Sequence, residues 1–96
     1  MSNAVRGEVE VELAGGKRRL CLTLGALAQM EAGLGVTGMG ALAQRVAQMS
    51  AGDLMVVLAA LLRGGGELEL ADGLGAAQVE PRAAAEAVAA AFRAAV

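Results

Sequence analysis

The chain has 96 residues, eight Lys and Arg against ten Asp and Glu, a formal net charge of −2 and one aromatic residue, Phe92. A chain this short can build one modest hydrophobic core, so we expect a single domain over residues 1–96. Its cations are mostly isolated, which argues against neutralising several phosphates and so against a nucleic-acid partner. The scarcity of aromatic side chains removes the usual stacking surfaces of small-molecule sites, and we expect no cofactor.

The cysteine content and the N-terminal residues predict a cytoplasmic protein. Cys21 is the one cysteine and cannot form a disulfide within the chain. Glu8, Glu10 and Glu12 stand where a secretory signal would be apolar. The longest apolar run, Leu54 to Leu62, has nine residues, against roughly 20 for a helix that crosses a bilayer. We therefore expect no membrane-spanning helix.

Residues 6–24 have the alternating pattern of two half-buried strands. Every second residue is apolar in two runs: Val9, Val11 and Leu13, then Leu20, Leu22 and Leu24. Between the runs, Gly15-Gly16 can adopt the positive φ angles of a two-residue turn. This turn would pair Val11 with Leu20, Val9 with Leu22, and Glu12 with Arg19. The sequence therefore predicts an antiparallel β-hairpin over about residues 6–24.

The apolar period becomes helical after Leu24. Leu27, Met30 and Leu34 predict a helix over about 25–34 that Thr23 caps, and Met39, Leu42, Val46 and Met49 predict one over 38–49. Ser50 and Asp53 have the spacing of a capping box, which predicts a third helix over 51–63. This third helix is the most apolar one, so we expect it to form the centre of the core.

The last third of the chain divides at Pro81. Residues 67–80 fit neither period because Gly73 and Gly75 interrupt the pattern, and we predict one short helix over about 71–78. Pro81 suits the first turn of a terminal helix over 81–95, in which Val88, Phe92 and Val96 are spaced by four. The predicted fold class is α+β and mostly helical, with an N-terminal two-stranded antiparallel β-hairpin followed by four or five helices.

The residues that could carry catalysis form no constellation, and the sequence predicts a protein that is not an enzyme. His, Trp and Tyr are absent, which leaves carboxylates, a few hydroxyls and Cys21. Glu8, Glu10 and Glu12 could bind a hard cation, but a solvated strand face balanced by Arg19 is the simpler interpretation. Cys21 has no neighbouring base and is interpreted as a bystander thiol. We assign no catalytic and no metal-binding residue.

Two glycine-rich segments are interpreted as helix ends. Gly33 to Gly38 has the spacing of a dinucleotide-binding loop, but it follows a predicted helix where that loop follows a strand. Gly64-Gly65-Gly66 lacks the Lys-Ser/Thr ending of a phosphate-binding loop. We interpret it as the stop of the third helix.

The terminal helix and its junction with the third helix are the predicted protein-binding surface. The helix is apolar nearly all round, and a small domain is expected to cover one stripe of it, Val88, Phe92 and Val96. The small residues on its far side would accept a partner helix or a second copy of this chain. The residues assigned to this surface are Ala87, Ala90, Ala94, Phe92 and Leu62. The alternative is that Ala is simply a good helix former on a solvated face.

Taken together, residues 6–35 and 50–67 resemble the small tail assembly chaperones of gene transfer agents and tailed phages, a family also labelled as a gene-transfer-agent tail protein. The resemblance rests on Arg6-Gly7-Glu8, the hairpin, the segment Leu22 to Leu27 and the Leu-rich helix that ends at Arg63-Gly64-Gly65-Gly66. It covers about residues 6–67. Beyond them, Gly73 and Gly75 interrupt the family's short acidic helix.

The resemblance implies a non-catalytic assembly chaperone or adaptor of a gene transfer agent or prophage. Its expected partner is the tape-measure protein or the tail tube protein. The alternative is a minor structural subunit of the tail, or a homo-oligomeric structural protein. The matching motifs are structural, so the resemblance assigns no functional residue.

Overall fold

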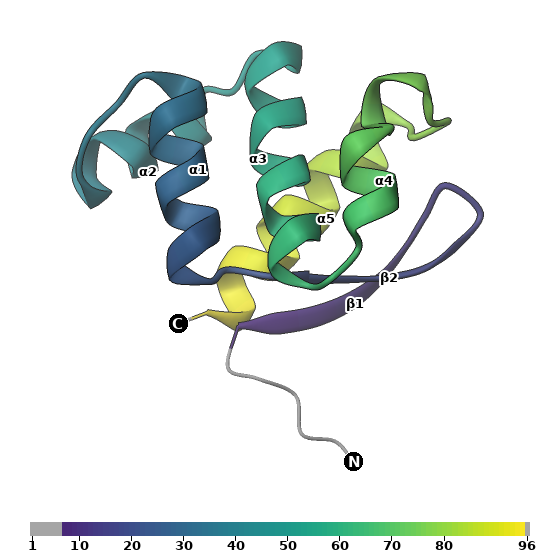
Figure 1. The fold of residues 1–96 in the computed structure, drawn as a ribbon. Coiled ribbons are helices and arrows are strands. Elements are labelled where there is room, and N and C mark those ends of the chain that lie inside the picture. Colours follow the sequence, from purple (N-terminus) through teal and green to yellow (C-terminus); the bar gives the residue numbers. More distant parts are fainter. Residues whose placement is uncertain (1–6, 96) are drawn as a thin grey trace.

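The computed structural model describes residues 7–95, and within them a β-hairpin precedes a set of helices. The predicted fold class, α+β and mostly helical, is confirmed. In Figure 1 the helices α1, α3 and α4 lie side by side, α5 crosses behind them, and the hairpin runs along their lower ends. The longest helices, α3 and α5, have 14 residues each, and none of the described helices is long and apolar enough to cross a membrane.

The hairpin consists of β1 (Glu8–Leu13) and β2 (Gly16–Cys21), and its register differs from the predicted one. Val9 pairs with Leu20 and Val11 with Arg18, so the prediction was wrong by two positions. The turn is Ala14-Gly15, with φ of 53° and 80°, where Gly15-Gly16 was expected. A shift by two leaves each side chain on its predicted face, so the alternation could not reveal it.

The inner face of the hairpin packs onto the helices. Leu13 and Leu20 are buried, while Val9 and Val11 are partly buried against the same core. Arg18 also lies on this face, at the turn end, where its Nε donates to the Leu13 carbonyl at 3.1 Å and its Nη2 to the Ala14 carbonyl at 3.2 Å. These two hydrogen bonds stabilise the turn, in which Ala14 has a positive φ that is strained for a residue other than glycine.

The first helix, α1 (Leu24–Leu34), begins and ends as the sequence indicates. The Thr23 hydroxyl accepts a hydrogen bond from the Ala26 N–H at 3.0 Å, which caps the first turn. Gly35 ends the helix in the left-handed conformation, with φ of 70°. Gly33 lies inside the helix, where a Cβ would come within 2.5 Å of Val56.

The second helix, α2 (Met39–Ala47), is shorter than predicted because it ends at Gln48. Leu42 is its buried residue. Arg45 ties it to its neighbours: it donates to both carboxylate oxygens of Asp53, at 2.6 and 3.0 Å, and to the Leu34 carbonyl at 2.9 Å. The hydrogen bonds from Arg45 hold the pKa of Asp53 below its usual value.

The third helix, α3 (Ala51–Gly64), is the centre of the core, as predicted. The Ser50–Asp53 capping box forms at its start. Four of its large apolar side chains are at most 2% exposed: Val57, Leu58, Leu61 and Leu62. It contacts α1, β2, α4 and α5, so both the helices and the hairpin pack against it.

The glycine run that ends α3 has two structural roles. Gly66 has φ of +87° and stops the helix, with the Glu67 N–H donating to the Leu62 carbonyl at 2.8 Å. Gly64 and Gly65 lie against β2, where a Cβ would come 2.1 Å from the Cys21 carbonyl oxygen or 2.0 Å from that of Arg19. The predicted helix stop is confirmed for Gly66, and the close approach to β2 is an additional role.

Residues 67–80 contain two short elements where one helix was predicted over 71–78. They are α4 (Leu68–Asp72) and the 3₁₀ helix η1 (Leu74–Ala76), separated at Gly73. Ala71 and Leu74 anchor them in the core. The one-helix prediction was therefore wrong in this segment.

The last helix, α5 (Pro81–Ala94), begins with proline in its first turn, as predicted. Its buried residues are Ala84, Ala87, Val88 and Ala91. The predicted buried stripe differs: Val88 is buried, Phe92 is half-buried, and Val96 lies outside the described residues. The burial is wider because α5 contacts both α3 and β1, and so is covered from two sides.

We predict that Gly65→Ala destabilises the protein by roughly 3 kcal/mol, the upper end of the usual cost of overpacking. The new Cβ meets the backbone of β2, which cannot rotate away as a side chain can. Gly52→Ala in the first turn of α3 is the matched control, since its nearest atom is 3.9 Å away. That control should be neutral or stabilising by up to about 1 kcal/mol. Equal unfolding midpoints in urea for the two variants would contradict the close packing.

We also predict that Ala14→Asn stabilises the hairpin by about 0.5–1 kcal/mol, because asparagine tolerates positive φ better than alanine. Gly16→Asn is the control, since Gly16 has no positive φ. Thermal unfolding should show the gain at position 14 alone. A gain in stability from the substitution at position 16 alone would instead support the register with a Gly15-Gly16 turn.

Candidate protein-binding surface

An apolar groove runs between α3 and the segment that leads into α5. We call it the α3 groove; its volume is about 210 Å³. Its lining is Ala51, Leu54, Met55, Leu58, Leu74, Gly75, Ala77, Val79, Pro81 and Ala84. None of these residues is charged, so a partner meets a mainly apolar surface here. Its volume is below the roughly 300–1,000 Å³ typical of small-molecule sites, which suits the insertion of a few side chains of a partner.

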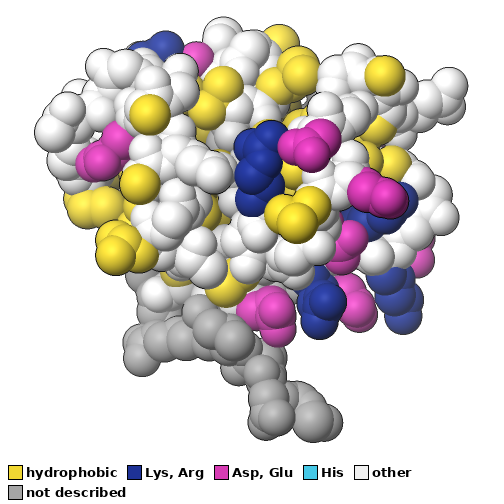
Figure 2. Space-filling model, viewed as in Figure 1, with side chains coloured by type: hydrophobic (Ala, Val, Ile, Leu, Met, Phe, Trp, Pro, Cys, Tyr) yellow, Lys and Arg dark blue, Asp and Glu magenta, His cyan; other side chains and the backbone are white. Residues whose placement is uncertain are grey.

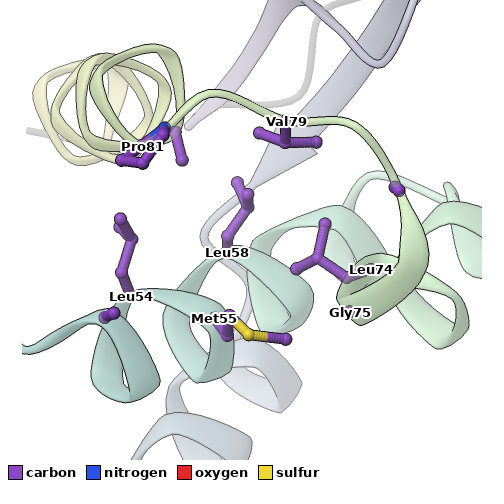
Figure 3. Close-up of a pocket in the computed structure, with 10 residues that line it drawn as sticks. Leu54, Met55, Leu58, Leu74, Gly75, Val79 and Pro81 are labelled. Carbon is purple, nitrogen blue, oxygen red and sulfur yellow. The ribbon is translucent and has the colours of Figure 1, made fainter.

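Local sequence explains why the groove stays open. Ala77 and Glu80 both have extended backbone. Pro81 favours this conformation in the residue directly before it, which is Glu80. The segment therefore bridges from η1 to α5 with a small side chain at Ala77. Figure 3 shows Leu54 and Leu58 pointing from α3 toward Val79 and Pro81, with Leu74 at the side. Leu58 and Leu74 form a buried floor, at 2% and 8% exposure.

Met55 stands at the rim of this groove and also borders a second one. The second groove lies between α1 and α3 and is lined by Gln29, Ala32, Gly33, Met55, Val56, Ala59 and Arg63. Met55 is 46% exposed. Its unbranched thioether can adjust to partners of different shape. We call the two grooves and the ridge at Met55 between them the Met55 surface.

One charged side chain, Arg63, lines the second groove of the Met55 surface, and none lines the α3 groove. Figure 2 shows hydrophobic side chains spread over the helical face, with many charged side chains along the lower, hairpin side and a neighbouring basic and acidic group in the middle of the view. Arg63 borders the second groove and donates to Asp72 at 3.0 Å. Both side chains of this pair are solvated, so the pair adds little energy. The surface is therefore suited to apolar recognition with a polar rim.

The residues predicted for binding lie outside the Met55 surface, and two of them are buried. Leu62 is 0% exposed and offers no side chain to a partner, whereas Ala87 is 3% exposed and, with Ala90, lines a groove between β1 and α5. Ala90, Phe92 and Ala94 are half-buried along α5. The structure does not bring these five residues together with the α3 groove. The prediction assumed that one stripe of α5 is covered, whereas α3 and β1 cover two sides of it.

Sequence reasoning missed the Met55 surface, although one signal for it was present. The unbroken apolar run Leu54 to Leu62 places apolar side chains on every side of α3. A helix in a small domain cannot bury all of its sides, so one apolar side is expected to remain exposed. What the run could not reveal is the side left open. That side depends on where η1 and α1 pack.

The remaining candidate groups show no reactive geometry. Cys21 is buried in β2, and burial, assisted by the charge of Glu8, raises the pKa of its thiol. A raised pKa lowers the thiolate population, which is the reactive form. Within residues 7–95 no three His, Cys, Asp or Glu side chains gather as a metal site.

Comparison with known proteins gives one family. Residues 6–96 match the model of a protein family described as "Phage tail tube protein, GTA-gp10". No curated protein and no solved structure gives a significant match.

We predict that Met55→Lys changes the free energy of unfolding by no more than about 0.5 kcal/mol, as is usual for surface positions. Leu58→Ala on the groove floor should cost about 2–5 kcal/mol, because it leaves a cavity in the core. Urea denaturation of both variants measures the difference. A cost above 2 kcal/mol for Met55→Lys would place Met55 in the core and remove it from the candidate surface.

Proposed function

Because the chain belongs to the GTA-gp10 family of phage tail proteins, we propose that it is an assembly chaperone or adaptor that binds another tail protein through the Met55 surface. The observation that carries the proposal is an exposed methionine between two grooves, one of them lined entirely by uncharged residues. Its partner is the tape-measure protein or the tail tube protein, a segment of which presents apolar side chains to the α3 groove.

The distribution of exposed apolar side chains favours a transient partner. Within residues 7–95 the exposed large hydrophobic side chains are Leu24, Met39, Met55 and Leu68, on four different helices. Obligate interfaces are large and resemble a core cut in half. Four separate side chains match that description poorly, whereas a chaperone needs only a small apolar contact that it can release.

A second candidate is a structural subunit of the tail, and the description of the family as a tail tube protein favours it. The two candidates differ in occupancy. A structural subunit stays in the finished particle at a fixed ratio to its neighbours, whereas a chaperone leaves. Quantitative mass spectrometry of purified particles separates them.

The binding test uses the full chain mixed with the purified tape-measure protein and, separately, with the purified tail tube protein. We predict that Met55→Lys weakens complex formation at least about tenfold, because a charge enters an apolar contact. Met39→Lys is the matched control: Met39 is 59% exposed but lies on α2, outside the Met55 surface. Isothermal titration calorimetry measures both. Equal affinities for the two variants would contradict the assignment of the Met55 surface.

A further inference from the structure

The outer edge of β1 carries unpaired backbone groups. The Arg19 N–H donates to the Glu67 carboxylate at 2.9 Å, so it points away from β1. Arg19 pairs with Glu10, and residues directly opposite in an antiparallel pair share the same orientation. The backbone groups of Glu10, and by alternation those of Glu8 and Glu12, therefore point to the outer edge of β1. Among residues 7–95 they have no hydrogen-bond partner there.

The corresponding edge of β2 is closed. The carboxylate of Glu67 accepts the hydrogen bond of the Arg19 N–H, and Gly64 and Gly65 lie against the carbonyls of Cys21 and Arg19. The hairpin thus has one edge covered by the turn after α3 and one edge open. Open edges are where another chain can add a strand.

A groove lies along this open edge. It has a volume of about 590 Å³ and is lined by Val11 and Glu12 of β1 and by five residues of α5. No residue of β2 lines it, so it lies on the outer side of β1. On the α5 side the lining consists of the small residues Ala83, Ala87 and Ala90 and of Glu86 and Arg93, whose opposite charges balance, so a strand added to β1 could approach the helix closely at the alanines.

The charges beside the edge define the side chains that an added strand needs. Glu10 and Glu12 are exposed, and neither forms an ion pair among the described residues. Cross-strand neighbours of opposite charge stabilise a sheet, and like charges destabilise it. Residues opposite the glutamates should therefore be Lys or Arg, while those opposite Val9 and Val11 should be apolar. Within the hairpin β2 follows this rule in part, with Lys17 opposite Glu12 and Arg19 opposite Glu10.

A second copy of this chain does not meet that requirement. The outward-facing residues of β1 are all glutamates, so pairing two β1 edges places Glu opposite Glu. The β2 edge of a second copy is covered by its own Glu67, Gly64 and Gly65. The occupant must come from another protein.

We propose that β1 binds an extended segment of a partner protein in which basic and apolar residues alternate. The segment adds a third strand at the outer edge, with its basic side chains beside Glu10 and Glu12 and its apolar side chains over the alanines of α5. This inference rests on the proposed function for the identity of the partner as a tail protein. It uses residues that are separate from the Met55 surface.

The test uses the full chain and a short synthetic peptide of alternating lysine and valine, followed by NMR of the backbone amides. The peptide should shift the amides of Glu10 and Glu12 and slow their hydrogen exchange. A peptide of alternating glutamate and valine should bind at least about tenfold more weakly. Raising the salt concentration should weaken the binding of the lysine peptide, since its contacts with the glutamates are solvated ion pairs.

Two variants separate main-chain pairing from simple attraction of charge. Glu10→Pro removes an outward N–H that the hairpin does not use, and should abolish the exchange protection that the peptide gives to the remaining amide, that of Glu12. Glu10→Gln keeps the N–H, and should retain protection with weaker affinity. If Glu10→Pro unfolds the chain, amide exchange of the Glu10→Lys, Glu12→Lys double variant provides the test: the glutamate peptide should now protect the amides of residues 10 and 12, whereas attraction of charge alone would bind that peptide without protecting them.

Several outcomes would overturn the inference. These are no amide shift in β1, equal binding of both peptides, or amides of Glu10 and Glu12 that are already protected from exchange in the free chain. Concentration-dependent protection without peptide would show a second copy at this edge and would equally refute it. Met55→Lys should leave peptide binding unchanged, so failure at the edge is distinguishable from failure of the Met55 surface.

Discussion

The contact between the end of α3 and the backbone of β2 determines how the rest of the molecule is arranged. Gly64 and Gly65 bring the helix against the carbonyls of Cys21 and Arg19, at a distance that no side chain would allow. The chain then turns at Gly66, and Glu67 accepts the Arg19 N–H. The same turn therefore joins the helical layer to the hairpin, covers one strand edge and leaves the other edge open.

The position of α3 also explains why the two candidate surfaces are separate. One side of α3 is covered by β2, α5 and α1, and its large side chains form the core. The remaining side holds Met55 between two grooves. The open β1 edge lies next to α5. The Met55 surface offers apolar contact, whereas the β1 edge offers backbone hydrogen bonds and negative charge, so as proposed binding sites the two would select different features of a partner.

The proposed binding through these two surfaces would be compatible with the small size and simple chemistry of this phage-tail protein. Apolar grooves and strand edges recognise general features of an unfinished chain, namely exposed hydrophobic side chains and unpaired backbone. Neither requires a polar constellation. In the proposed strand addition, the exposed glutamates of β1 would add selectivity, because they disfavour a second copy of the same strand.

The sequence by itself determined the features that depend on neighbouring residues: the hairpin, the caps at Thr23 and Ser50–Asp53, and the start of α5 at Pro81. Tertiary structure decided the strand register, since a shift by two residues preserves the alternation. It also decided the division of residues 67–80, the wide burial of α5 and the open side of α3. These features depend on which elements pack together. Gly65 is an example: it has no side chain, so the sequence pattern gives no sign that it packs against β2.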